Sequence, residues 1–121
     1  MASNVFLTKS FSFAVSIVNT CKNLVENKRE YILSKQLLRS GTAVGALIRE
    51  AQNAESKADF IHKLGIAQKE CDESIYWLEL LKETNYIDDK TFEELKFTAT
   101  ELLKLFRISI VTLKQKITNK S

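Results

Sequence analysis

Apolar residues recur every three or four positions along residues 92–117, and this repeat constrains the fold more than any other feature of the sequence. Such spacing places the apolar side chains on one face of an α-helix, where they can be buried together. Asp88 or Asp89 can cap the start of that helix, and Glu93 and Glu94 suit its positive end. The pattern predicts a helix over residues 89–117 with a buried face of Phe92, Leu95, Ala99, Leu102, Phe106, Ile110, Leu113 and Ile117.

Three earlier segments show the same period and predict helices over residues 5–27, 30–54 and 57–84. The predicted core line of the first helix is Phe11, Ala14, Ile17, Val18, Cys21, Leu24 and Val25, widened by Phe6 and Phe13. The core line of the second is Leu37, Gly41, Val44, Ile48 and Ala51. The core line of the third is Phe60, Leu64, Ala67, Cys71, Ile75 (or Ser74), Leu78 and Leu81.

The connections between these helices are short. The chain has 121 residues, no proline and three glycines, so one domain is expected, and the many tight turns of an all-β fold are not. Ser56 is a suitable N-cap for the third helix, with Asp59 in capping-box position three residues later. We therefore predict one all-α domain over residues 1–121, an antiparallel up-down-up-down four-helix bundle. A continuous helix through position 56 is the alternative.

Two of the three glycines, Gly41 and Gly45, lie four residues apart inside the second predicted helix. Glycine in a helix interior costs about 1 kcal/mol relative to alanine, so two of them in one helix require a reason. Both fall on the apolar stripe, one turn apart, where the missing side chains would let a neighbouring helix approach closely. A backbone kink is the competing explanation.

The third and fourth helices carry more apolar residues than their core lines need. The additional residues are Ile61, Ile66, Trp77, Leu80, Phe97, Leu105, Ile108 and Val111. At about 100° per residue, Phe97, Ile108 and Val111 cluster away from the core stripe. A contiguous exposed apolar patch marks an interaction site. We predict a subunit interface that includes Ile61, Trp77, Phe97, Ile108 and Val111, with a wide core stripe as the alternative.

Charge is distributed unevenly along the chain. The net charge is +3, but residues 58–101 hold eleven acids against five Lys or Arg, whereas residues 102–121 hold five basic residues and no acid. On the fourth helix, Lys96, Lys104, Arg107 and Lys114 fall within an arc of about 80°. This arc is either a solvated edge or a surface that follows a nucleic-acid backbone with little sequence specificity.

Candidate catalytic groups are few. His62 is the only histidine, and Asp59-x-x-His62 puts two possible metal ligands on one helical face. A di-iron bundle needs two such helices and two more carboxylates. The sequence has no Cys-x-x-Cys pair and no phosphate-binding glycine loop. We predict no enzymatic activity, no catalytic residue, no metal and no cofactor; a metal-dependent enzyme using Asp59 and His62 is the alternative.

The location expected for the chain is the cytoplasm. Lys9 and several serines interrupt the apolar residues near the start, so no signal peptide is predicted, and no run of about 18 apolar residues could span a membrane. Cys21 and Cys71 lie within apolar helical patterns, which predicts buried thiols in a reducing compartment.

Residues 34–81 carry a pattern that resembles a known family. In the second predicted helix the matching residues are Gln36, Arg39, Ser40, Gly41, Ala43, Val44, Gly45, Ile48, Arg49, Glu50 and Ala51. In the third they are Phe60, Ile61, Leu64, Ile66, Ala67, Glu70, Glu73 and Leu78 to Leu81. The run resembles the 23S rRNA intervening-sequence protein family, also called the four-helix-bundle protein family.

This resemblance implies a function as well as a fold. Members are often encoded within bacterial 23S rRNA genes and are similar in fold to the accessory variability determinant of diversity-generating retroelements, a basic pentamer that binds nucleic acid and a reverse transcriptase. It implies a homopentamer with an RNA- or DNA-associated role and no enzymatic activity. A protein-interaction scaffold or adaptor that does not contact nucleic acid is the alternative. Arg39, Arg49 and Glu50 match family positions and are interpreted as polar contacts of the bundle or an interface.

Overall fold

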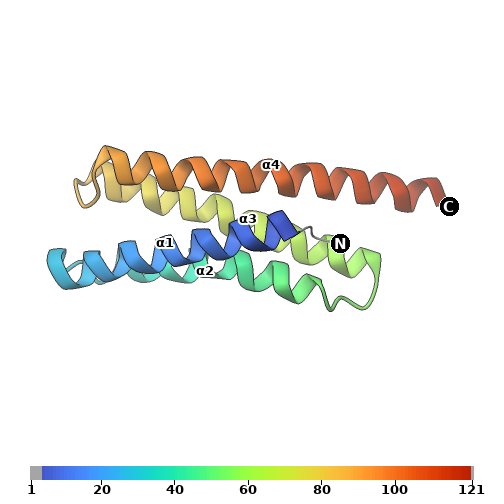
Figure 1. Cartoon of the computed structure of the whole chain (residues 1–121), viewed down its shortest axis with the longest axis horizontal. Coiled ribbons are helices and arrows are strands. Elements are labelled where there is room, and N and C mark those ends of the chain that lie inside the picture. The colour runs from blue at the N-terminus through green and yellow to red at the C-terminus, as the bar shows by residue number, and fades with distance from the viewer. Residues whose placement is uncertain (1–3, 121) are drawn as a thin grey trace.

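Four α-helices make up the structure, a computed structural model that describes residues 4–120 and the side chains of residues 5–118. They are α1 (Asn4–Lys28), α2 (Leu33–Ala51), α3 (Lys57–Glu83) and α4 (Asp89–Lys120). Consecutive helices run in opposite directions, and both the α1–α2 and the α3–α4 connections lie at the same end of the bundle (Figure 1). The predicted all-α fold with four helices is confirmed, and residues 4–120 contain no strand.

The helix ends follow local chemistry that the sequence only partly reveals. Ser56 caps α3 by accepting a hydrogen bond from the Asp59 amide at 3.0 Å, and Asp88 accepts one from the Thr91 amide at 2.8 Å before α4. Without glycine or proline at the turns, Arg29 and Asn85 adopt left-handed backbone conformations (φ 54° and 66°) just beyond α1 and α3. This conformation ends a helix and reverses the chain.

α2 is shorter than the predicted range of 30–54. At its start, the carboxylate of Glu30 accepts hydrogen bonds from the amides of Ile32, Leu33 and Ser34, so residues 30–32 form a cap instead of a helical turn. At its end, the amides of residues 52–54 bond to carbonyls three residues back, which forms a tight turn. Polar side chains and turn geometry therefore override the apolar period at both ends.

The core lies between all four helices, and the predicted faces of α2 and α3 are buried within it. On α3 the buried residue is Ser74 rather than Ile75, and its hydroxyl donates to that of Ser40 on α2 at 2.9 Å. Near the N-terminus of α1, Phe6 packs edge-on against Phe106 with ring centroids 4.7 Å apart. Beyond Phe106, the residues Ile110, Leu113 and Ile117 are only half-buried, because α3 and α4 separate toward that end (Figure 1).

The prediction for the core face of α1 was partly wrong. The buried residues are Phe6, Ser10, Phe13, Ile17, Cys21 and Leu24. Phe11, Val18 and Val25, which were predicted to lie in the core, are exposed, and Ala14 is half-buried. α1 carries two apolar lines, and only one of them can face α2 and α4. The other forms an exposed apolar strip that the sequence interpretation had merged with the core.

Candidate nucleic-acid and subunit interfaces

The four basic residues singled out on α4 do not share one side. Lys96, Arg107 and Lys114 lie on the flank toward α3, where Lys114 lines a groove between the two helices, and Lys104 lies on the outer side. Lys104, Arg107 and Lys114 are exposed, and Lys96 is half-buried, with its Nζ 5.5 Å from the centre of the Phe92 ring. Within residues 5–118, none of the four forms an ion pair with an acid. Lys96, Arg107 and Lys114 fall within about 20° of one another on the helix and span about 27 Å, whereas Lys104 lies about 80° away.

The acids of the third quarter are partly neutralised by neighbours. Arg39 on α2 pairs with Glu70 at 3.0 Å and also with Glu73, both on α3. Glu73 additionally accepts a hydrogen bond from the Trp77 indole, and this bond and Arg39 outweigh desolvation and lower the pKa of Glu73. At the start of α4, by contrast, Glu93 and Glu94 are exposed. The first turns of α4 are therefore acidic, and its second half is basic.

The residues predicted for a subunit interface divide into two groups. Phe97, Ile108 and Val111 expose 66%, 63% and 50% of their surface on the outer side of α4. Ile61 is buried, and Trp77 is half-buried against the core with its indole N–H bound to Glu73. Phe97, Ile108 and Val111 could therefore contact a partner without any rearrangement of the bundle. Lys104 lies between Phe97 and Ile108 on the same side, so an apolar contact there would also cover Lys104.

A second exposed apolar surface, missed in the sequence, lies on the outer side of α1 and α2. Its exposed members are Phe11, Val15, Val18, Val25 and Leu38. Two hollows interrupt it. The first hollow, of about 420 Å³, is lined by Leu7, Ser10, Phe11 and Ala14 of α1 and by α2 residues that include Gly45 and Ala46. The second hollow, of about 220 Å³, is lined by Val18, Cys21, Lys22, Val25 and Glu26 of α1 and by Leu38 of α2.

The two glycines of α2 face α1. A Cβ atom added at Gly41 would lie 2.8 Å from both Cγ atoms of Ile17, and one added at Gly45 would lie 3.4 Å from the carbonyl oxygen of Ser10. Gly41 thus lets the backbone of α2 come within contact of a buried isoleucine. Gly45 leaves part of the first hollow open.

Asp59 and His62 lie in different surroundings and do not form a common site. The Asp59 carboxylate accepts a hydrogen bond from the Glu55 amide and lies 3.7 Å from Lys63 Nζ. His62 is exposed and lines a groove of about 670 Å³ between α3 and α4, where Gly65 contributes no side chain. Among the described residues, no group of three or more His, Cys, Asp or Glu side chains is placed to hold a metal ion.

Both cysteine thiols are buried and point at backbone carbonyls. Cys21 Sγ lies 3.3 Å from the Ser34 oxygen, and Cys71 Sγ lies 3.4 Å from the Ala99 oxygen. Burial, reinforced by Glu30 for Cys21 and by Asp72 for Cys71, raises the pKa of Cys21 to about 11 and that of Cys71 to about 12. The thiolate is the reactive form, so neither thiol is activated for nucleophilic chemistry at neutral pH.

This burial predicts a labelling experiment. In native protein at pH 8, both thiols are expected to react with a disulfide reagent such as 5,5′-dithiobis(2-nitrobenzoate) at least about a hundredfold more slowly than a free cysteine. In guanidinium chloride, two thiols per chain should react rapidly. Rapid native labelling of one thiol would contradict the burial and would identify a reactive cysteine.

The amino-acid sequence matches a known protein family over most of its length. Residues 3–107 match the sequence profile of the 23S rRNA-intervening sequence protein family. The chain belongs to this family. The resemblance based on residues 34–81 is therefore confirmed, and it extends through α1 and most of α4. No curated protein matches the chain.

A solved structure supports the same assignment. The chain is similar to a protein of unknown function from the S23 ribosomal protein family of Bacteroides thetaiotaomicron, with 52% identity and a TM-score of 0.87. The match covers 88% of this chain and 98% of the Bacteroides chain. In the present 23S rRNA-intervening sequence protein, the family-pattern residue Arg39 joins α2 to α3, whereas Arg49 and Glu50 are exposed beside the first hollow.

None of the helical segments that the structure describes combines the length and apolarity needed to cross a bilayer.

Proposed function

We propose that this 23S rRNA-intervening sequence protein is a non-enzymatic oligomer that associates with RNA or DNA through the basic side of α4. The observation that carries the proposal is the line of Lys96, Arg107 and Lys114, spread over about 27 Å without ion-pair partners among the described residues. Unpaired cations spaced along one side of a helix suit repeated phosphate groups, and their contacts are independent of base sequence.

Oligomer formation strengthens this proposal. The two exposed apolar surfaces, on α4 and on α1–α2, favour contacts between copies, and a homopentamer is the assembly that the family resemblance implies. Several copies would present several basic lines to one nucleic acid, which raises the overall affinity without any new type of contact. Lys104 would contribute least, because it lies among the apolar residues of α4.

A salt-dependent binding assay tests the nucleic-acid role. Wild-type protein is titrated against a fluorescent RNA stem-loop and a DNA duplex between about 50 and 200 mM salt, and the affinity should fall steeply as salt rises. The double variant Arg107→Glu/Lys114→Glu should lose at least about tenfold in affinity and show a shallower salt dependence, because it loses two phosphate contacts.

The control is a second double variant that changes the net charge of the protein by the same amount at a different part of the surface. Lys28→Glu/Lys90→Glu alters two exposed lysines at the end of the bundle where α1 joins α2 and α3 joins α4. It should change the affinity by less than about threefold. Equal losses in both double variants would mean that net charge alone drives binding, and absence of binding at low salt would reject the nucleic-acid role.

The alternative is a protein-interaction scaffold. The groove between α3 and α4, with Ile61, Ile110 and Ile117 in its lining, is the surface that favours it. A scaffold predicts that Arg107→Glu/Lys114→Glu leaves nucleic-acid affinity unchanged.

A further inference from the structure

We infer that the outer side of α4 in one copy packs into the two hollows between α1 and α2 of a second copy oriented in the same direction. This inference rests on the proposed oligomer and specifies which two surfaces meet. Phe97 would enter the second hollow, between Val25 and Leu38, and Ile108 would enter the first hollow, beside Ala46.

The shapes of the two surfaces are complementary. On α4, the side chains of Phe97 and Ile108 protrude from the outer side and expose about two-thirds of their area. On α1–α2, small residues such as Ala14, Gly45 and Ala46 leave the first hollow open between two helices. Protruding side chains of one helix that fit depressions between the helices of another are the usual mode of helix packing.

The spacing of the two surfaces also matches. Four of the five α1 residues that line the second hollow follow by eleven positions a residue that lines the first, in the pairs Leu7 and Val18, Ser10 and Cys21, Phe11 and Lys22, and Ala14 and Val25; the fifth, Glu26, has no such counterpart. Ile108 follows Phe97 by the same eleven positions. Eleven residues make three helical turns and rise about 16 Å, so two side chains on α4 are in register with two hollows on α1.

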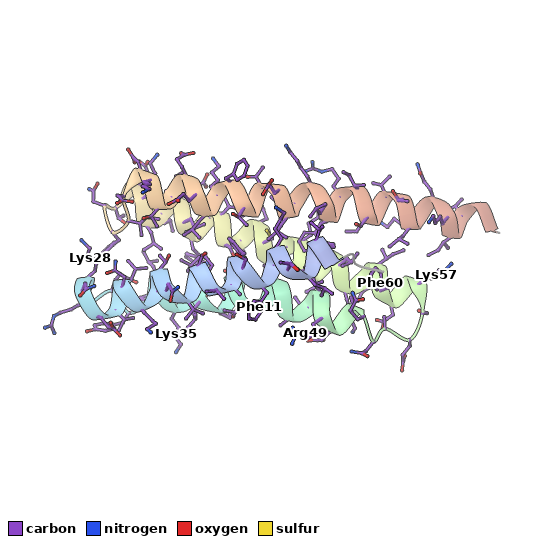
Figure 2. All side chains as sticks on the ribbon, viewed as in Figure 1. Phe11, Lys28, Lys35, Arg49, Lys57 and Phe60 are labelled. Carbon is purple, nitrogen blue, oxygen red and sulfur yellow. The ribbon has the colours of Figure 1, made fainter. Side chains whose placement is uncertain are left out.

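Charge selects the direction. Lys22, Arg29 and Lys35 lie near the end where α1 joins α2, and Figure 2 shows Lys35 there. Glu93 and Glu94 lie at the same end on α4, and Lys104 and Arg107 lie farther along. In copies that point the same way, the acids of α4 meet the lysines of α1–α2. Reversing one copy would instead place Lys104 and Arg107 against those lysines.

Two different surfaces that bind each other form a head-to-tail contact, which builds a ring or a filament rather than a two-fold dimer. This property allows a decisive mixing experiment. The first variant, Phe97→Asp/Ile108→Asp, loses the protruding side chains but keeps the hollows. The second, Leu38→Asp/Ala46→Arg, blocks the hollows but keeps the protruding side chains. All four positions are exposed, so each variant is expected to fold, and circular dichroism and thermal unfolding are the measurements that check this.

Size-exclusion chromatography with light scattering gives the readout. Wild type should exceed the 13.8 kDa of one chain, and each variant alone should be a monomer. A one-to-one mixture should form a dimer of about twice 13.8 kDa, because one intact pair of surfaces remains. A mixture that stays monomeric while wild type assembles overturns this inference and leaves the proposed oligomer intact. A monomeric wild type rejects both.

Cysteine cross-linking tests the direction. The pair Phe97→Cys/Leu38→Cys should form disulfides between copies under mild oxidation, and Phe97→Cys/Ala46→Cys should not. Wild type is the background control, since Cys21 and Cys71 are buried. Cross-linking only in the second pair overturns the shared direction, and none in either pair overturns the contact.

Discussion

Replacing Gly41 with alanine is expected to lower the free energy of unfolding by about 1–2 kcal/mol, although alanine is the better helix former. The added Cβ would lie 2.8 Å from two atoms of Ile17, a side chain with no exposed surface. Because Ile17 is fully buried, relieving this contact requires a shift of its side chain within the core or a wider separation of α1 and α2. Urea denaturation followed by circular dichroism measures the change.

Gly65 is the matched control, because it lies in a helix interior but faces open space. A Cβ atom added there meets no atom within 4 Å. Gly65→Ala should therefore stabilise the protein by about 0.5–1 kcal/mol, the ordinary gain in helix propensity. In a double-mutant cycle, Ile17→Ala should make Gly41→Ala much less harmful. Equal effects at positions 41 and 65 would contradict the close approach of α1 and α2.

Replacing Glu30 with glutamine is expected to cost about 1–3 kcal/mol at pH 7, because it removes a buried charged acceptor. Glu30 exposes 8% of its surface, and its carboxylate accepts hydrogen bonds at 2.7–3.2 Å from the amides of Ile32, Leu33 and Ser34. Glutamine would turn an N–H group toward at least one of these donors. Glu79 is an exposed glutamate on α3, so Glu79→Gln is the matched control. The difference in the free energy of unfolding between the two variants, measured by chemical denaturation, isolates the contribution of the buried carboxylate.

The same substitution predicts a pH dependence. Burial opposes ionisation of Glu30, but the hydrogen bonds from Leu33, Ser34 and Ile32 outweigh it and hold the pKa of Glu30 below its usual value. A carboxylate with a lowered folded-state pKa stabilises the protein above its unfolded pKa of about 4.3, and this stabilisation is lost as pH falls through the folded pKa. The difference between wild type and Glu30→Gln should therefore be constant from pH 7 to about 5 and shrink in stronger acid. A difference that grew on acidification would refute this role.

The helices themselves could be predicted because their signals are local. α2 and α3 each carry one apolar line, so a period of 3.6 residues leaves only one side to bury, and the predicted lines agree with the structure. Ser56 and Asp88 cap the helices that follow them, and residues a few positions apart suffice to indicate this.

The exposed surfaces could be predicted only in part. Phe97, Ile108 and Val111 were recognisable because they lie opposite a complete core line on α4. The exposure of Phe11, Val18 and Val25 could not be recognised, because α1 carries two apolar lines of similar length and periodicity does not show which of them is buried. Ile61 and Trp77 are covered by the bundle itself, which depends on where α4 and α2 pass.

The sequence alone therefore determined four helices, the buried sides of α2 and α3, and the family, since each depends on residues close together in the chain. Tertiary structure alone decided which line of α1 is buried, that Glu30 caps α2 as a buried carboxylate, and that Arg39 reaches Glu70 and Glu73. The physical reason is that periodicity describes one helix at a time. Which side is covered depends on neighbours brought together by folding, and here Ile17 against Gly41 sets how closely α1 approaches α2.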